Sequence, residues 1–205
     1  MKFTSDIDID VGDREKALVY FKQTPASISR DGGLVKHNTG VYFTDIPKDP
    51  FTGFATVDHK TAEDRGYIKL DILNVGLYSQ VKNEQHLDQL LAQEPAWERL
   101  YDKDFCSKLI HIGNHYDTLI KMPEAVNTIE KLAMFLAVIR PAKRHLIGKP
   151  WAEVEKTVWE KPTDDSYYFK KAHAISYSHL VVVNVNLISA QEYYFYALYV
   201  WTLLT

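Results

Sequence analysis

Acidic and branched apolar side chains alternate along residues 5–11, close to the start of the printed chain. Successive side chains of a β-strand point to opposite faces of its sheet, so this alternation predicts a strand. Ile7, Ile9 and Val11 would then enter a core. The acidic side chains would share the opposite face: Asp6, Asp8 and Asp10.

This acidic face needs a physical explanation because like charges repel. Side chains two residues apart on one strand face lie about 6–7 Å from each other. Carboxylates at that spacing resist ionisation unless a cation lies between them, and a divalent metal ion satisfies this need. The pattern therefore predicts a metal site. The alternative is an exposed edge strand whose acids discourage pairing with other chains.

Composition limits the class of protein. The chain has 205 residues, 46% of them hydrophobic, and we expect one globular unit. A formal charge of −3 with 24 Lys and Arg excludes a protein that coats nucleic acid through charge alone, so any such contact is local. The single cysteine, Cys106, cannot form an internal disulfide. This cysteine usage and the absence of a long apolar run predict a cytoplasmic protein without membrane contact.

Periodicity predicts an α+β fold. The first third, residues 1–75, reads as a small mixed β-sheet with a helix over 14–22 and strands over 41–43, 55–57 and 67–72. In the last of these strands, Lys69 and Asp71 share the face opposite Ile68, Leu70 and Ile72.

The remaining residues, 76–205, read as mostly helical. Asn127 or Thr128 caps a helix that ends before Pro141. The last quarter reads as two helices divided near Ser189, with aromatic residues around the second that suit a core or a partner surface.

Five stretches, in the same order, resemble motifs of the family C bacterial replicative DNA polymerases, the DNA polymerase III alpha type. They are similar to the D-x-D-x-D palm strand with its following Arg helix, the Lys-His-Ala-x-Gly-Val stretch, the Gly-Leu-x-Lys-x-Asp-x-Leu strand, the Arg-Pro-Gly helix end and the Phe-Asn-Lys-x-His-Ala segment of the fingers. The corresponding residues here are 6–14, 30–41, 66–73, 128–141 and 169–178. The resemblance implies a nucleotidyltransferase-like palm followed by a fingers-like region.

The resemblance also implies roles for individual residues. In that family the second and third acids of the first strand and the later aspartate bind two metal ions. Asp8, Asp10 and Asp71 would be the catalytic ligands of Mg²⁺ or Mn²⁺, with Asp6 as a further candidate ligand. Two metal ions held this way activate a primer hydroxyl and stabilise the leaving pyrophosphate. Basic candidates for phosphate or DNA contact, each of which can also be a solvated surface charge, are Lys69, Arg30, Lys36, His37, Lys60, Arg140, Lys171 and His173.

The chain also departs from that family. It lacks the Gly-Ser-rich triphosphate loop before the acids, the thumb, and the phosphoesterase, clamp-binding and duplex-binding parts, and Arg-Pro-Gly is here Arg140-Pro141-Ala142. We therefore expect a piece of a split polymerase, or a miniaturised nucleotidyltransferase of viral type, that acts on DNA and nucleotide with a second protein supplying the missing parts. One alternative is a catalytically inactive relative that binds DNA or a replication protein. Another is an unrelated α+β binding protein.

A zinc site is the other chemistry suggested by the sequence. Cys106, His111 and His115 are potential ligands, and the two histidines are spaced i, i+4. Gly113 interrupts a helix between them, and no acidic residue completes an H-E-x-x-H pattern. We expect Cys106 to be a small core residue instead.

Overall fold

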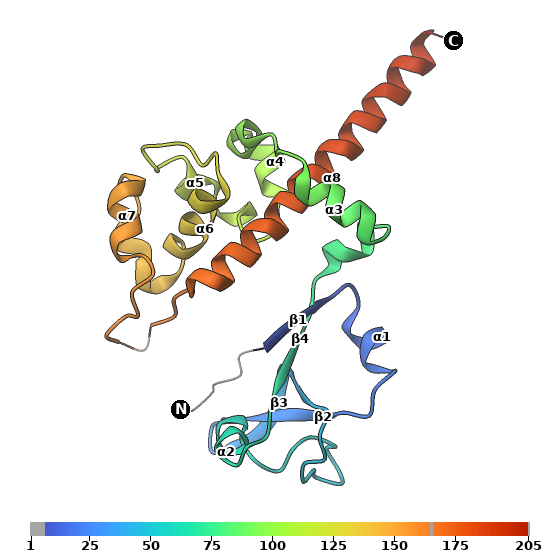
Figure 1. Cartoon of the computed structure of the whole chain (residues 1–205), viewed down its shortest axis with the longest axis vertical. Coiled ribbons are helices and arrows are strands. Elements are labelled where there is room, and N and C mark those ends of the chain that lie inside the picture. Colours follow the sequence, from blue (N-terminus) through green and yellow to red (C-terminus); the bar gives the residue numbers. More distant parts are fainter. Residues whose placement is uncertain (1–6, 165, 205) are drawn as a thin grey trace. The chain divides into compact units, whose positions relative to one another are not determined.

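The computed structural model describes residues 7–164 and 166–204, so Asp6 lies outside the described residues. The chain divides into two compact units, Met1–Val81 and Lys82–Thr205. The N-terminal unit carries the β-sheet and the second unit is helical (Figure 1). The expected α+β class is confirmed at this level.

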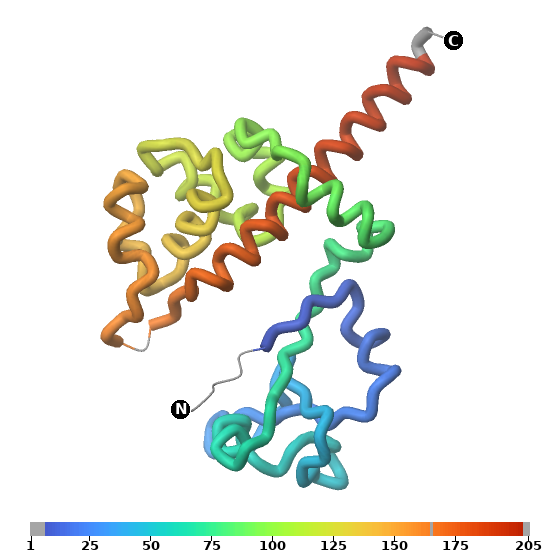
Figure 2. Tube along the Cα trace, in the orientation of Figure 1, coloured from blue at the N-terminus to red at the C-terminus, as the bar shows by residue number. Residues whose placement is uncertain are grey.

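The N-terminal unit is built on a four-stranded sheet with the order β1-β4-β3-β2. Strand β1 pairs with β4 in parallel, while β3 is antiparallel to both β4 and β2. Figure 2 shows the chain leaving β1 and returning to it at β4 after the β2–β3 hairpin. The strands are β1 Ile7–Val11, β2 Thr24–Arg30, β3 Gly33–Tyr42 and β4 Leu70–Asn74, and the helical elements are α1 Arg14–Leu18, α2 His59–Asp64 and the 3-10 helix η1 Gly76–Gln80.

The β2–β3 hairpin turns at Arg30-Asp31-Gly32-Gly33, a stretch whose adjacent glycines predict a flexible turn from the sequence alone. Asp31 and Gly32 both have positive φ angles, 52° and 78°, which aspartate tolerates better than most residues and glycine adopts freely. The register of the two strands shifts between Pro25 and Ser27, as a β-bulge does. Strand β2 was not predicted, because Pro25 reads as a helix terminator in the sequence.

Small apolar clusters cover the sheet. Leu18, Val41 and Ile72 form one, with Val11 packed against it. The prediction that Ile7 and Ile9 enter a core is wrong, because β1 is an edge strand and these side chains remain 43% and 41% exposed. The second cluster packs under α2 and the loop before it: Ala26, Tyr42, Ile46, Ala55 and Ala62.

Three predicted elements of this unit have different bounds. The helix predicted over 14–22 ends at Leu18. Residues 55–57 do not form a strand: Ala55 forms an isolated bridge with Lys48, and Asp58, just beyond them, forms another with Ser27. The strand predicted over 67–72 begins at Leu70, and Ile68 is 55% exposed. Glycine at position 66, with φ of 87°, ends α2 and delays the extended backbone.

The helical unit is built around α6, Ile129–Val138. The seven consecutive residues 132–138 of this helix are all buried. Thr128 caps it as predicted, accepting a hydrogen bond from the Lys131 backbone N–H at 3.2 Å. Helices α6 and α8 pack together in the large apolar cluster. The other elements are α3 Glu84–Ala92, η2 Trp97–Tyr101, α4 Lys103–Ser107, η3 Gly113–His115, α5 Tyr116–Leu119, η4 Pro141–Leu146 and α7 Trp151–Thr157.

Helix α8, Lys171–Leu204, is continuous, so the predicted division near Ser189 is wrong. Serine can remain inside a helix when its neighbours bury apolar side chains, and residues 180–187 of α8 are buried. The later turns continue past the other helices of the unit (Figure 1). Their aromatic side chains are exposed. None of the described helices has the length and apolar character needed to cross a membrane.

Candidate functional site

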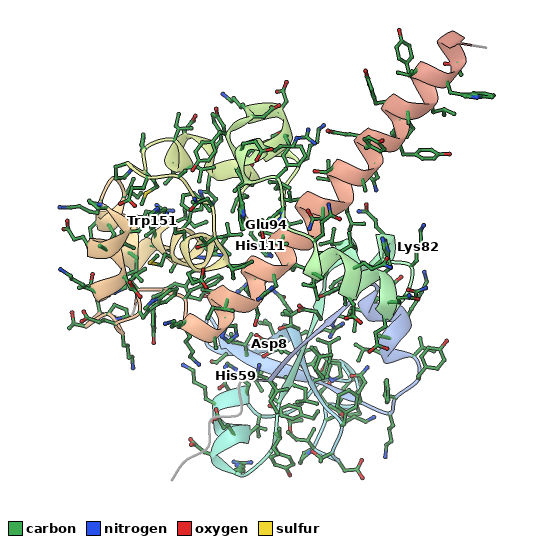
Figure 3. All side chains as sticks on the ribbon, turned by 45° about the horizontal axis from the view of Figure 1, so that its top comes forward. Asp8, His59, Lys82, Glu94, His111 and Trp151 are labelled. Carbon is green, nitrogen blue, oxygen red and sulfur yellow. The ribbon has the colours of Figure 1, made fainter. Side chains whose placement is uncertain are left out.

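The acidic residues of the two parallel strands lie beside each other. Asp8 of β1 is directly opposite Asp71 of β4 in the register, and Asp10 is opposite Leu73. Neighbouring strands are about 4.8 Å apart, and residues opposite each other in a parallel pair point to the same face. Asp8 is labelled on β1 in Figure 3. Two adjacent strands therefore present Asp8, Asp10 and Asp71 on one face of the sheet.

Asp71 is held by three neighbours. Its carboxylate forms an ion pair and hydrogen bond with Lys69, and accepts a hydrogen bond from Thr39 Oγ1 at 2.6 Å. His37 Nδ1 lies 3.7 Å from the same carboxylate, whose side chain is 13% exposed. Burial alone would raise the pKa of Asp71, but the hydrogen bonds and the Lys69 charge outweigh burial and lower it. Asp71 is therefore ionised and already neutralised by a cation.

The backbone of β3 fixes His37 next to this pair. Its Nδ1 accepts hydrogen bonds from the backbone N–H groups of Gly40, at 2.9 Å, and Thr39, at 3.3 Å. Burial, followed by the Lys69 charge, lowers the pKa of His37, so the imidazole is neutral near pH 7. A Cβ atom on Gly40 would lie 2.8 Å from Lys69 Cδ and 3.1 Å from His37 Nδ1. Glycine at position 40 therefore leaves the space that the Lys69 side chain uses to reach Asp71.

Asp8 and Asp10 have a different electrostatic environment. Both residues are exposed on the edge strand. Partial desolvation and the neighbouring Asp8 carboxylate raise the pKa of Asp10. The charge of Asp10 in turn adds to burial in raising the pKa of Tyr78, which follows β4 in η1. The part of the Asp10 shift that comes from Asp8 is the carboxylate repulsion expected from the sequence, and a cation near Asp8 and Asp10 would relieve it.

The three acids fit a metal site only in part. Within residues 7–164 and 166–204, no group of three or more His, Cys, Asp or Glu side chains converges as a metal centre requires. The contacts of Asp71 explain this, because its oxygens face Lys69 and Thr39. Asp8 and Asp10 are suited to bind one divalent cation, and Asp71 could join them if Lys69 moved away.

The other basic residues with predicted roles are distributed over both units. Three lie exposed in the N-terminal unit, at the end of β2, on β3 and in α2: Arg30, Lys36 and Lys60. Three lie in the helical unit: Arg140 after α6, and Lys171 and His173 in the first turn of α8. The structure places only Lys69 and His37 of this set in contact with Asp71, among the residues it describes.

Several neighbours of this site were not predicted from the sequence. Thr39 bonds to Asp71, and the ring of His59 lies 5.3 Å from that of His37, with Asp58 Oδ2 3.6 Å from His59 Nδ1. The guanidinium of Arg14 donates to the carbonyl oxygens of Ile72 at 3.2 Å and Thr39 at 3.4 Å, which ties α1 to β4 and β3. Extending the strand at 41–43 backwards through its polar residues would have found Thr39. The sequence carries no comparable signal for His59.

Among the residues that the structure describes, Cys106, His111 and His115 are not gathered as the ligands of a zinc ion would be. Cys106 is fully buried, and its Sγ lies 3.9 Å from the Ile112 carbonyl oxygen. Burial raises the pKa of its thiol to about 11, so the thiolate that binds zinc is disfavoured. The expectation of a core cysteine is confirmed.

Three structural features bear on the function of the sheet. The acids lie on the parallel strands β1 and β4 at the edge of the sheet, and Asp71 is neutralised by Lys69. The other basic candidates Arg140, Lys171 and His173 belong to the other compact unit. The chain matches no family model, no curated protein and no solved structure in the three comparisons with known proteins.

Proposed function

We propose that the N-terminal sheet is a metal-dependent nucleotidyl-transfer site that acts on DNA together with a partner chain, as a palm-like piece of a family C polymerase. The observation that carries this proposal is the register of β1 and β4, which places Asp8 beside Asp71. Three acids on one face of two adjacent strands are what two-metal phosphoryl transfer requires of a protein.

Mg²⁺ or Mn²⁺ would be held first by Asp8 and Asp10, whose mutual repulsion favours a cation. Divalent ions supply charge neutralisation at the attacking and leaving oxygens of such a reaction. Asp71 would complete the ligand set if its carboxylate exchanged Lys69 for the metal. Lys69 would then be released on the same face of the sheet, where its ammonium can contact a phosphate group.

The metal part of this proposal is tested by calorimetric titration of the whole chain with Mn²⁺ or Mg²⁺. We expect saturable binding in the wild type and its loss in the Asp8→Asn, Asp71→Asn double variant. Asp88→Asn is the matched control, because Asp88 is an exposed acid of α3 in the other unit. Equal binding by the wild type and the double variant would rule out the metal site.

Catalysis requires a separate measurement. Primer extension and nucleotide transfer would be assayed with the chain alone and with candidate partner chains from the same genome. We expect activity only with the partner, and its abolition by Asp10→Asn but not by Asp88→Asn. A partner is part of the proposal because no triphosphate loop or duplex-binding motif was recognised in the 205 residues, and positioning of reactants can contribute up to about 7–11 kcal/mol to lowering a barrier.

A second candidate function is DNA or protein binding without catalysis, by a relative that has lost metal binding. The observation that favours it is the ion pair between Lys69 and Asp71, which satisfies the third acid without a metal. This candidate predicts no activity with any partner and DNA binding that weakens as salt rises. Metal binding that depends on Asp8 and Asp71 would argue against it.

A further inference from the structure

The last turns of α8 contain an exposed aromatic segment, residues 193–201. The earlier turns differ, because residues 180–187 of the same helix are buried. One continuous helix therefore has a part that packs in the core and a part that presents rings to solvent. Six aromatic side chains of the segment are between 61% and 75% exposed: Tyr193, Tyr194, Phe195, Tyr196, Tyr199 and Trp201.

A neutralised carboxylate marks the start of the aromatic segment. Glu192 forms an ion pair with Arg99 and another with Lys108 Nζ at 3.0 Å, which ties α8 to the preceding elements of the helical unit. From residue 193 to residue 204 the sequence has no Asp, Glu, Lys, Arg or His. The exposed turns therefore begin where the last charge of the helix is already paired, and they carry no charged side chain of their own.

The aromatic segment is apolar on all sides. Consecutive residues of an α-helix are about 100° apart around its axis, so the four residues 193–196 cover the full circumference. A helix of this kind needs burial on more than one side. A helix that lies on a membrane surface keeps a polar or charged face, and proteins that stack single-stranded nucleic acid place basic side chains beside their rings. Residues 193–201 provide neither feature, which favours a protein surface as the occupant.

The exposed area has the size of a protein–protein interface. Complete burial of an aromatic side chain removes about 150–250 Å² from water, so six side chains that are about two-thirds exposed present about 600–1,000 Å². A stable interface takes about 800 Å² from each partner, whereas monomers rarely expose apolar patches of more than a few hundred Å². The aromatic segment alone therefore offers the area that a stable association requires.

We propose that the aromatic segment forms a helical bundle with the same segment of further copies of this chain. Equivalent residues meet in a symmetric assembly, and an uncharged segment can meet its own copy without like-charge repulsion. Aromatic rings also pack well on each other, as the edge contact between Tyr194 and Phe195 at 6.2 Å shows within one segment. The proposal concerns the helical unit and does not depend on metal binding or catalysis by the sheet.

The oligomeric state of the whole chain tests this proposal. Light scattering and sedimentation should give a discrete mass, a fixed multiple of the chain mass, within the range of about 1 μM to about 100 μM. Tyr194→Lys combined with Tyr196→Lys should weaken the association at least about tenfold. These residues lie about 200° apart around the helix, so the double variant places like charges on two sides of the bundle. Lysine is a good helix former, so the far-ultraviolet circular dichroism should stay that of the wild type.

Two controls match this double variant. Tyr194→Phe combined with Tyr196→Phe keeps both rings and should associate as the wild type does. Phe51→Lys places a charge on an almost fully exposed ring of the sheet unit and should also leave the association unchanged.

Trp201 provides a measurement on the wild type that does not depend on variants that fold. Its side chain is exposed in the single chain, so its fluorescence emission should move to shorter wavelengths as the concentration rises and the segment becomes covered. Trp201→Phe should remove this shift while keeping the mass of the oligomer.

A monomer at every concentration would overturn the proposal, and flotation of that monomer with phosphatidylcholine vesicles would assign the segment to a lipid surface instead. Species that grow without a fixed stoichiometry would also overturn it, because they indicate unspecific aggregation. The same holds if Phe51→Lys weakens the association as much as the double lysine variant does.

Discussion

The sheet unit and the helical unit bury different kinds of residues. The helical unit has one large apolar cluster, with Phe105, Leu132 and Phe135 almost completely inaccessible to water. The sheet unit has small clusters, and its buried residues include the charged Asp71. Apolar burial is insensitive to pH and cations, whereas a buried ion pair depends on both. We infer that the helical unit provides a stable framework and that the sheet unit responds to its ionic environment.

The buried charges of the two units show the same difference. Lys143 of the helical unit is buried, and its ammonium donates to the Thr157 carbonyl oxygen at 2.6 Å, a partner fixed in the backbone of α7. Asp71 is satisfied instead by two side chains, Lys69 and Thr39, that can rotate away. A side-chain partner can be exchanged for a metal or a phosphate, and a backbone partner cannot be exchanged so easily.

The largest predicted effect concerns the helical core. Phe135→Ala removes a fully buried ring from α6 and should lower the free energy of unfolding by about 3–5 kcal/mol. Tryptophan fluorescence in urea measures this unit selectively, because all four tryptophans lie beyond residue 81: Trp97, Trp151, Trp159 and Trp201.

The control for this prediction is Ile120→Ala, because Ile120 is 51% exposed and its truncation should cost about 0.5 kcal/mol or less. Amide exchange in β3 should stay unchanged in Phe135→Ala under conditions where the helical core opens. If β3 loses protection together with α6, the two units unfold as one and the comparison between them breaks down.

The next effect concerns the ion pair of the sheet. Asp71→Asn leaves the Lys69 ammonium, on a side chain that is 19% exposed, without its counter-charge and should cost about 1.5–3 kcal/mol at pH 7. The pKa of Asp71 is lowered in the folded state, so its contribution is complete above its unfolded pKa of about 3.9 and is lost as the pH falls through the lower folded value. The difference between wild type and variant should therefore shrink below about pH 4.

Amide exchange of β3 and β4 as a function of pH measures this difference in the sheet unit. Asp8→Asn is the control, because Asp8 is exposed and its substitution should change stability by less than about 0.5 kcal/mol. A constant difference between wild type and Asp71→Asn from neutral to acidic pH would show that the loss of stability does not come from the charge of Asp71.

Local sequence signals predicted the features that depend only on side chains close by in the sequence. The Thr128 cap, the end of α6 near Pro141 and the turn at residues 31–32 were correct because each depends on neighbours within a few positions. The continuity of α8 was missed, since Ser189 is held in the helix by packing against distant elements. The α+β class followed from the spacing of apolar residues, which changes from the two-residue period of strands to the 3.6-residue period of helices near residue 75.

The site was predictable only at the level of the strand face. Alternation in residues 5–11 and 67–72 placed Asp8, Asp10 and Asp71 on polar faces, and the register then brought Asp8 next to Asp71. The contacts of Asp71 with Thr39 could not be foreseen, because they depend on how β3 pairs with β4 through only a few residues. The burial expected for Ile7 failed because alternation cannot tell an edge strand from a central one.

A smaller effect is expected at the N-terminus of α6. Thr128→Ala removes the side-chain acceptor of the Lys131 N–H and should lower the free energy of unfolding by about 1 kcal/mol. Tryptophan fluorescence in urea again provides the measurement. Thr128→Ser keeps the hydroxyl group and should lie within a few tenths of the wild type, about 0.3 kcal/mol. An equal loss in both variants would assign the effect to the methyl group rather than to the cap.

The smallest effect on stability has the clearest electrostatic signature. Asp8→Asn removes the like charge beside Asp10, so the raised pKa of Asp10 should fall towards its ordinary value. Added Mg²⁺ should lower the same pKa in the wild type, since a cation favours the ionised carboxylate. Carboxyl resonances followed by NMR through acid titration measure both shifts.

The sign of this effect separates the two acids of the sheet. A pKa that is raised in the folded state means that ionised Asp10 opposes folding. This destabilisation is complete above the folded pKa of Asp10 and absent below its unfolded pKa. Asp71 has the opposite effect, because its pKa is lowered in the folded state. Asp88→Asn should leave the Asp10 titration unchanged, because Asp88 belongs to the other unit. If Asp8→Asn and Mg²⁺ both leave the pKa of Asp10 in place, the carboxylates of β1 do not interact, and the sheet loses the electrostatic reason for binding a metal ion.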